Sequence, residues 1–330
     1  MLKRTLTGIV LVLFVAGFIA GGYFVSPIFL DMLILLFLAG ATYEMFKCFK
    51  DAGYKMFIAP PVFMLVAAYP TFYLLQHFAG KPTGNVTIGV QGLLAVFVFA
   101  VMLCLTIFTF KPAKHTQEEV DAAKEQGIEL ETDSPKAHEL KDLFANVFLL
   151  VYPIVFMSLS WVLSFKYSAI FVVLFAIFVP TLGGDAFAYW FGSMIGGKKL
   201  CPKISPKKTV AGAIGGLCGA VIISLVFWMV FEMFADNYPK FIEGCHYVAF
   251  ISHETSGWAW KTALIYIALG LVIGVLAELG DLAASRIKRA IGIKDYGKIF
   301  PGHGGFMDRL DSIMYSLAIL LIAFTCIYAR

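Results

Sequence analysis

Residues 143 to 164 read LFANVFLLVYPIVFMSLSWVLS and contain no Asp, Glu, Lys or Arg. A helix needs roughly 20 apolar residues to cross about 30 Å of hydrocarbon, and this run has that length. Other segments meet this requirement or come close to it, near residues 5–25, 28–46, 57–78, 87–109, 168–190, 211–234, 261–280 and 307–328. We therefore predict an all-α, polytopic membrane protein with about nine transmembrane helices.

The composition agrees with that prediction. Of 330 residues, 60% are hydrophobic and 15% are charged, and the mean hydropathy is +0.82, which is too apolar for an average soluble domain. The net charge of +4 is small, and on a membrane protein it mainly reflects loop orientation, so it does not indicate nucleic acid as a partner. The six cysteines lack CxxC spacing, which indicates neither a disulfide framework nor a zinc site.

The lysines and arginines predict how the helices are oriented. With the N-terminus in the cytoplasm, most of the 26 basic residues fall in loops on that side. The opposite side holds Lys81, Lys166, Lys240, Lys261 and Arg330. Because cytoplasmic loops carry an excess of Lys and Arg, we expect a cytoplasmic N-terminus and a multi-pass protein of the cell membrane.

The loops divide the predicted protein into parts. Residues 111–142 are rich in Asp and Glu and are predicted to form an acidic cytoplasmic insert, which a solvated spacer explains better than a catalytic element. The insert separates an N-terminal transmembrane part of four helices, residues 1–110, from a C-terminal transmembrane catalytic part of five helices, residues 143–330. The external loop 235–260 holds two histidines, which are a weak metal signal.

The predicted sixth span carries a carboxylate among apolar residues. Asp185 follows Pro180, Gly183 and Gly184, which we expect to interrupt the helix just before it. A charge deep in a membrane costs roughly 2.5–3.5 kcal/mol, so such a residue usually faces a cavity and has a partner. We favour a functional site for Asp185 over a purely structural ion pair.

The loop after this span holds two lysine-containing motifs. GSMIGGKK, residues 192–199, imitates a phosphate-binding loop but lacks the preceding strand and the hydroxyl that such a loop needs. SPKKT, from Ser205 to Thr209, places Lys207 and Lys208 between two hydroxyls, which suits neutralisation of a triphosphate. Anchoring by positive charge explains the lysines alone but does not require the hydroxyls. Glycines at GxxxG spacing in the next helix indicate close helix packing.

A second polar cluster surrounds the end of the predicted eighth span. Glu278, Asp281, Ser285 and Lys288 follow one another at spacings of three, four and three. If the helix continues past the membrane surface, all four share one face.

Two further carboxylates, Asp308 and Asp311, lie three apart on the entry turn of the predicted ninth span. Before them comes a basic loop that includes Arg289 and Lys294 and ends in PGHGG. Carboxylates alone would repel phosphates, and basic residues alone would not arrange them for attack. The combination is therefore typical of a site for a divalent cation that carries a nucleoside triphosphate. His303 in PGHGG stays open between a general base, a phosphate donor and a loop-ordering residue.

Two non-enzymatic explanations account for less of this pattern. A basic segment that attracts anionic lipid explains the lysines and arginines but not Asp281, Asp308 and Asp311. A transporter explains buried carboxylates, but its broken helices should recur in both halves, whereas the polar clusters lie in one half.

The sequence from Ser285 to Asp311, SRIKRAIGIKDYGKIFPGHGGFMDRLD, resembles the signature of the CDP-diacylglycerol synthases, or phosphatidate cytidylyltransferases. Every fixed position of the pattern S-x-x-K-R-x4-K-D-x-G-x3-P-x-H-G-G-x-x-D-R-x-D is present. The upstream D-x-x-A-Y and S-P-K-K-T elements of the family resemble residues 185–189 and 205–209, so the specific resemblance runs from residue 180 to 312. Ala211 and Ala284 stand where the commonest form of the family carries acids.

The resemblance implies that a phosphatidate phosphate oxygen attacks the α-phosphorus of CTP, forming CDP-diacylglycerol and releasing pyrophosphate. It implies a nucleotidyltransferase of phospholipid biosynthesis whose partners are CTP, phosphatidate and membrane lipid, with Mg²⁺ as cofactor and K⁺ as a second metal. A homodimer is one option that stays open. The alternatives are a CTP-dependent polyprenol or dolichol kinase, which would release CDP, and, less favoured, a lipid or ion transporter, which would leave CTP intact.

Roles for single residues follow from the same resemblance. The resemblance implies that Asp281 and Asp308 bind the metal ions, and we add Asp311 as a third expected ligand. The expected catalytic set is Asp281, Asp308, Asp185, Lys288 and His303. The phosphates of the two substrates are expected to contact Ser205, Lys207, Lys208, Thr209, Ser285, Arg289, Lys294 and Arg309.

Overall fold

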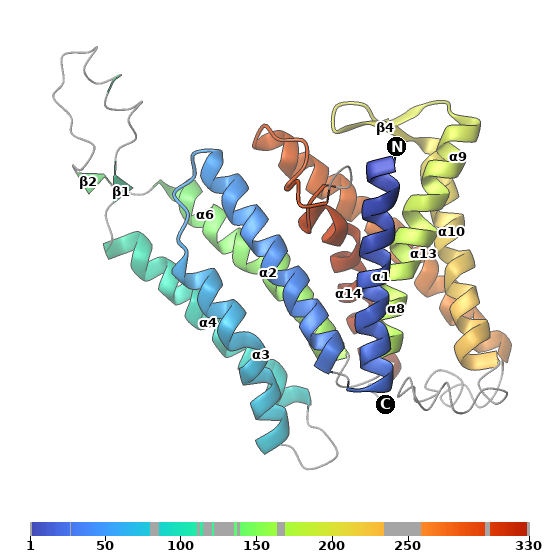
Figure 1. Ribbon diagram of the computed structural model, residues 1–330, viewed down its shortest axis with the longest axis horizontal. Helices are drawn as coiled ribbons and strands as arrows, with labels where there is room; N and C mark the ends of the chain where they lie inside the picture. Colours follow the sequence, from blue (N-terminus) through green and yellow to red (C-terminus); the bar gives the residue numbers. More distant parts are fainter. Residues whose placement is uncertain are drawn as a thin grey trace.

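The computed structural model describes residues 2–26, 28–79, 86–110, 113–114, 121, 135–136, 139–163, 169–233, 259–300 and 304–328. Within them the chain folds into a bundle of long helices with two small two-stranded sheets (Figure 1). α1 begins at the end of the bundle where β4 lies, and α14 ends at the opposite end.

The helices follow one another along the described part of the chain. The first are α1 (Leu2–Phe24), α2 (Ile28–Asp51), α3 (Ala59–Ala79) and α4 (Val86–Phe110). The next combine α-helical and π-helical turns: α6 (Leu140–Leu149), η1 (Leu150–Val155), α7 (Phe156–Leu163), α8 (Ala169–Phe178), η3 (Val179–Ala186) and α9 (Phe187–Ile195). After β3 (Lys199–Cys201) and β4 (Ser205–Thr209) come α10 (Val210–Trp228), η4 (Met229–Met233), α13 (Ala259–Ala290) and α14 (Met307–Tyr328).

Every apolar segment that was predicted to span the membrane is helical over nearly all of its described residues, and only Val25, Phe57 and Ile58 lie outside a helix. In this part of the chain, six helices are long and apolar enough to cross a membrane, and two shorter apolar helical stretches, Ala59–Leu74 and Leu93–Thr109, accompany them. The prediction of an all-α membrane protein is therefore confirmed. The number of about nine spans and the cytoplasmic N-terminus stay predictions.

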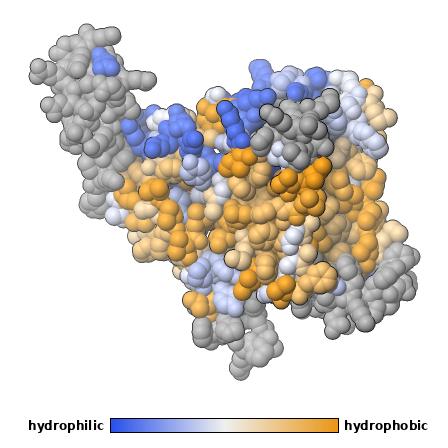
Figure 2. Space-filling view, viewed as in Figure 1, coloured by the Kyte–Doolittle hydropathy of each residue, from blue (hydrophilic) through white to orange (hydrophobic). Residues whose placement is uncertain are grey.

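The surface of the bundle is apolar around its middle and polar at one end. Figure 2 shows hydrophobic residues over the middle of the helices and the most hydrophilic ones near the β3–β4 end. Apolar side chains such as Val12 and Val66 are 67% and 69% exposed. Lipid tails can cover such side chains, and helices satisfy their own backbone hydrogen bonds, so this surface suits a bilayer.

Asp185 lies on a helix that does not break. We expected Pro180, Gly183 and Gly184 to interrupt the sixth span just before Asp185. The regular α-helix does end at Phe178, but the chain stays helical through the π turns of η3 and continues as α9. The wider π turns accommodate the proline ring and its missing N–H group without ending the helix.

Glycines bring η3 and α10 into backbone contact. A Cβ added at Gly183 would lie 2.7 Å from the Ala220 Cα, and one added at Gly216 would lie 2.8 Å from the Gly184 carbonyl oxygen. No side chain fits at such distances, so the prediction that the GxxxG glycines serve close packing is confirmed. The contact holds the helix of Asp185 against α10.

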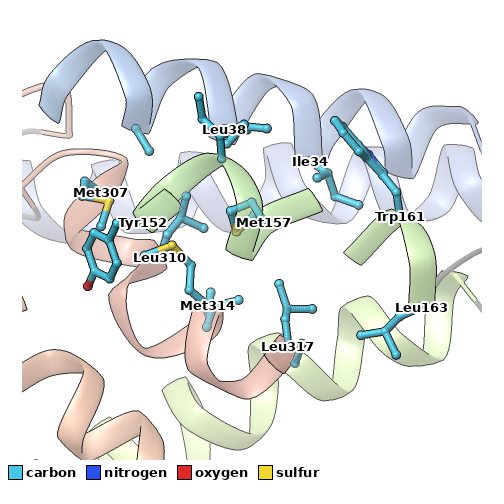
Figure 3. Close-up of a cluster of buried hydrophobic side chains, with 14 of the residues drawn as sticks. Ile34, Leu38, Tyr152, Met157, Trp161, Leu163, Met307, Leu310, Met314 and Leu317 are labelled. Atoms are coloured by element: carbon cyan, nitrogen blue, oxygen red, sulfur yellow. The ribbon is translucent and has the colours of Figure 1, made fainter. Parts of the chain in front are cut away.

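The buried core joins the two ends of the chain. Figure 3 shows Ile34 and Leu38 of α2 in one cluster with Met157 of α7 and with Leu310 and Met314 of α14. A helix from the N-terminal part therefore packs beside the helix that carries Asp308. These side chains are buried and closely packed, which favours a single arrangement of α2 and α14.

The acidic insert and the external loop enter the described residues only in part. β1 (Ala113–Lys114) and β2 (Pro135–Lys136) pair antiparallel, with Ala113 opposite Lys136. α6 begins at Leu140, so the last residues of the predicted insert are helical. The loop 235–260 lies outside the described residues, except for residues 259–260 at the start of α13. The division at 111–142 stays a prediction.

Candidate active site

The polar residues of the eighth span lie on one uninterrupted helix. α13 continues to Ala290 and carries Glu278, Asp281, Ser285 and Lys288. Because side chains three and four residues apart are neighbours on a helix, the expectation of one polar face is confirmed. This face ends at the polar end of the bundle.

The β3–β4 hairpin brings Lys208 to this face. β4 pairs antiparallel with β3, with Thr209 opposite Lys199. Lys208 Nζ lies 2.6 Å from Asp281 Oδ2 and 2.9 Å from Glu278 Oε1. Burial lowers the pKa of Lys208, but the carboxylates of Asp281 and Glu278 outweigh burial and hold that pKa above its ordinary value. The site therefore contains a protonated lysine.

A second ion pair joins α13 to the start of α14. Lys288 Nζ donates to Asp308 Oδ1 at 2.8 Å, and its ammonium lies 5.2 Å from the centre of the Tyr296 ring. The other oxygen, Asp308 Oδ2, accepts from the N–H groups of Tyr296 at 2.9 Å and Gly305 at 3.0 Å. Both oxygens of Asp308 are thus held by the loop and by α13.

Two more carboxylates approach this cluster. Asp185 of η3 lies close enough to Asp281 and Lys208 to interact with them electrostatically. Asp311 is 5% exposed and interacts in the same way with Asp281 and Asp185. The fold therefore gathers the four predicted aspartates around Lys208 and Lys288, although η3 lies far before α13 and α14 in the sequence.

Other predicted phosphate ligands lie at the edge of this cluster. Lys207, Arg289, Lys294 and Arg309 are exposed. Arg289 Nη1 donates to the Ile293 carbonyl at 3.1 Å, so part of its guanidinium faces its own loop. Their contacts with phosphate stay predictions.

The hydroxyl residues are placed differently from one another. Thr209 is buried, and its Oγ1 accepts from the Gly212 N–H at 3.0 Å at the start of α10. That bond is a helix N-cap, which gives the hydroxyl a structural role beside the phosphate contact predicted for it. Ser205 pairs with Cys201 in the hairpin, and Ser285 is half-buried on α13. His303 lies outside the described residues.

The carboxylates do not form a complete metal centre by themselves. Among the described residues, no group of three or more His, Cys, Asp or Glu side chains is arranged to hold a metal ion. The oxygen donors nevertheless suit Mg²⁺, which is commonly bound through one or two carboxylates together with substrate phosphates. Asp281, Asp308 and Asp311 thus stay predicted ligands of a site that a bound nucleotide would complete.

One acidic residue beside this site was missed in the sequence. Glu44 of α2 is 4% exposed, and its Oε2 accepts from the Met307 N–H at 3.0 Å. It also interacts electrostatically with Asp308. The available signal was an acid within an apolar segment, since an ionisable residue inside a membrane helix is by default a functional candidate. Glu44 thus adds one residue of the N-terminal part to a site whose other members lie in the C-terminal part.

Comparison with known proteins relates this chain to one family. The model of a family described as the cytidylyltransferase family matches residues 2–327. A phosphatidate cytidylyltransferase of Mycobacterium bovis is 28% identical over 291 residues, which cover 86% of this chain and 76% of that protein. A protein of the same name from Mycobacterium leprae is 26% identical over 92% of this chain and 83% of its own length. One from Staphylococcus epidermidis is 37% identical over 46% of this chain and 47% of its own length.

Proposed function

The chain belongs to the cytidylyltransferase family, and we propose that it transfers the cytidylyl group of CTP to phosphatidate, giving CDP-diacylglycerol and pyrophosphate. The protein is a nucleotidyltransferase of phospholipid biosynthesis, in line with relatives named phosphatidate cytidylyltransferase along most of the chain. One observation of the structure carries the proposal. Lys208 and Lys288 form ion pairs with Asp281 and Asp308 and interact electrostatically with Asp185 and Asp311, where β4, η3, α13 and α14 converge.

The reaction moves one phosphorus centre from one oxygen to another. A phosphate oxygen of phosphatidate forms a bond to the α-phosphorus of CTP, and the bond from that phosphorus to the oxygen bridging to the β-phosphate breaks. The electron pair leaves with pyrophosphate. Such a transfer depends mainly on positioning the reactants and neutralising charge, so no covalent enzyme intermediate is needed.

The two lysines suit this task. Lys208 and Lys288 are paired with Asp281 and Asp308 at 2.6 Å and 2.8 Å. Each ammonium group has three donors, so it can keep a carboxylate partner and also donate to a phosphate oxygen. Lys207, Arg289, Lys294 and Arg309, which are exposed, would contact the outer phosphates.

Mg²⁺ would be held by Asp281, Asp308 and Asp311, with Asp185 in support and K⁺ as a second metal. When bound, Mg²⁺ supplies Lewis-acid polarisation and neutralises the charge of the phosphates. Asp281 comes from α13, and Asp308 and Asp311 come from the first turns of α14. Carboxylates on rigid helices keep their separation as the nucleotide arrives, which favours one orientation of CTP.

The location of the site suits substrates of unlike solubility. The ion pairs lie at the polar end of an apolar bundle, where water-soluble CTP can meet phosphatidate that is held in the membrane. This end faces the cytoplasm in our proposal, with the N-terminus on the same side and the protein in the cell membrane. The surplus of basic residues in the loops of this end supports that orientation.

Product analysis tests the function. Purified protein receives CTP, Mg²⁺ and phosphatidate, and the nucleotide and phosphate products are identified. The expected products are CDP-diacylglycerol and pyrophosphate in equal amounts. Release of CDP without pyrophosphate would instead indicate a CTP-dependent lipid kinase. Intact CTP with folded protein would contradict an enzyme and favour a transporter.

A further inference from the structure

We propose that Glu44 of α2 is a positioning residue, whose carboxylate fixes the loop that holds Asp308. This inference rests on the proposed function, because the loop matters through the site it builds. Glu44 contacts no substrate phosphate in this proposal. It acts through backbone groups that also bind Asp308.

The first contact is at the start of α14. Glu44 Oε2 accepts from the N–H of Met307, the first residue of that helix, at 3.0 Å. The first N–H groups of a helix have no partner within the helix. A carboxylate there satisfies one of them and interacts favourably with the positive end of the helix dipole. Glu44 therefore caps α14 from another helix.

The second contact is with two glycines of the loop. A Cβ added at Gly297 or at Gly305 would overlap the Glu44 carboxylate. The backbone at both positions thus packs directly on the carboxylate, and only glycine leaves the room for it. Two points of the loop, eight residues apart in sequence, are held against one side chain.

These same points hold Asp308. Gly305, which packs on Glu44, donates its N–H to Asp308 Oδ2 at 3.0 Å. Tyr296, the residue before Gly297, donates its N–H to the same oxygen at 2.9 Å. A shift of the loop away from Glu44 would therefore move both donors and change the direction of the Asp308 carboxylate.

α2 is built to hold this loop along one face. Its residues Phe37, Gly40, Glu44 and Cys48 follow at spacings of three, four and four, so they lie on the same side of the helix. The Phe37 ring meets the Phe306 ring edge-on at 5.1 Å between centroids, and a Cβ at Gly40 would overlap the Phe306 ring. These contacts extend the docking face on the N-terminal side of Glu44.

Cys48 extends the same face on the other side. Its thiol donates to the Tyr296 carbonyl oxygen at 3.0 Å. Glu44 thus lies midway along a continuous contact between α2 and the loop.

Three variants test the inference. Glu44→Ala removes the acceptor, and Glu44→Gln keeps an oxygen of the same reach without the charge. Asp31→Asn is the matched control, because Asp31 is another acid of α2 with a side-chain partner, Tyr69, at 2.8 Å. Asp31 lies 13 residues before Glu44 in α2, which is about 20 Å along the helix.

The first readout is amide hydrogen exchange of the full-length protein in detergent. Glu44→Ala should speed exchange in peptides that contain Gly305 and Met307, with little change in peptides from α10. Glu44→Gln and Asp31→Asn should both resemble the wild type. Unchanged exchange at Gly305 and Met307 in Glu44→Ala would overturn the positioning role, and so would an equal increase throughout the protein.

The second readout is steady-state kinetics of pyrophosphate release. Glu44→Ala should lower kcat about a hundred-fold with little change in the KM for phosphatidate, since a misplacement of about 1 Å in a site can cost that much. Glu44→Gln should recover most of this loss, and a Gln variant as slow as the Ala variant would contradict the proposal. Wild-type protein without activity would refute the proposed function, whereas the exchange measurement would still decide the role of Glu44.

Discussion

The ion pair between Lys288 and Asp308 offers a quantitative test of how the site is stabilised. We consider Lys288→Met, Asp308→Asn and the double variant. The side chains are 10% and 5% exposed, and the Nζ and Oδ1 atoms are 2.8 Å apart. Because the pair is buried, the loss of one partner leaves an uncompensated charge away from water, which costs about 3–5 kcal/mol.

Local contacts reduce this cost for each single variant. In Lys288→Met, Asp308 keeps the N–H groups of Tyr296 and Gly305, so we expect a loss near the lower limit, about 3 kcal/mol. In Asp308→Asn, Lys288 keeps the face of the Tyr296 ring at 5.2 Å, a contact worth up to about 2 kcal/mol when desolvated. The double variant contains neither charge, so its loss should fall short of the sum of the single losses by about 1–3 kcal/mol.

The measurement is reversible unfolding of the full-length protein in mixed micelles, followed by tryptophan fluorescence. The free energies of unfolding of the wild type and the three variants form a double-mutant cycle. Additive losses within about 0.5 kcal/mol would refute the reasoning, because independent sites behave in that way. A cycle on Lys208 and Asp281, which are 22% and 27% exposed, should give a smaller coupling.

Further outcomes are expected from single changes. Gly183→Ala should lower the melting temperature, since its Cβ would meet the α10 backbone and overpacking costs about 1–3 kcal/mol. Gly184→Ala should leave the melting temperature unchanged, because nothing lies within 4 Å of its added Cβ. Equal losses in the two variants would contradict the packing model. Thr209→Ala should lower the free energy of unfolding by about 1 kcal/mol, and Thr209→Ser should lower it much less. An unchanged free energy of unfolding in Thr209→Ala would contradict a stabilising N-cap bond. Asp281→Asn should abolish pyrophosphate release while the protein still inserts into membranes, and near-normal turnover would refute its role. Removal of divalent cations with EDTA should stop the reaction and added Mg²⁺ should restore it; activity in EDTA would exclude the metal proposal.

Local patterns in the sequence predicted much of the architecture. The apolar runs predicted the helices, because a chain in lipid must satisfy its backbone hydrogen bonds within each segment. The spacing of Glu278, Asp281 and Lys288 predicted a shared face, because helical periodicity alone decides it. The GxxxG spacing of the glycines in α10 predicted a close helix contact, because this spacing places small residues on one side of the helix.

Other features could not be read from local pattern. The interruption expected before Asp185 takes the form of π turns, which relieve the strain that Pro180 would impose on an α-helix, and the sequence pattern did not indicate that form. Glu44 lies 263 residues before its partner Met307, and no periodicity connects positions so far apart.

The sequence by itself determined that this chain is a helical membrane protein with the cytidylyltransferase signature. The length of each apolar run and the order of the charged residues depend only on residues that are neighbours in the sequence. Both can therefore be read without the folded structure. Only the tertiary structure decided which charges meet: Lys208 with Asp281, Lys288 with Asp308, and Glu44 with the loop between α13 and α14. Those pairings depend on helix packing, in which close-packed side chains and backbone-level glycine contacts select one arrangement among many that the same helices could form.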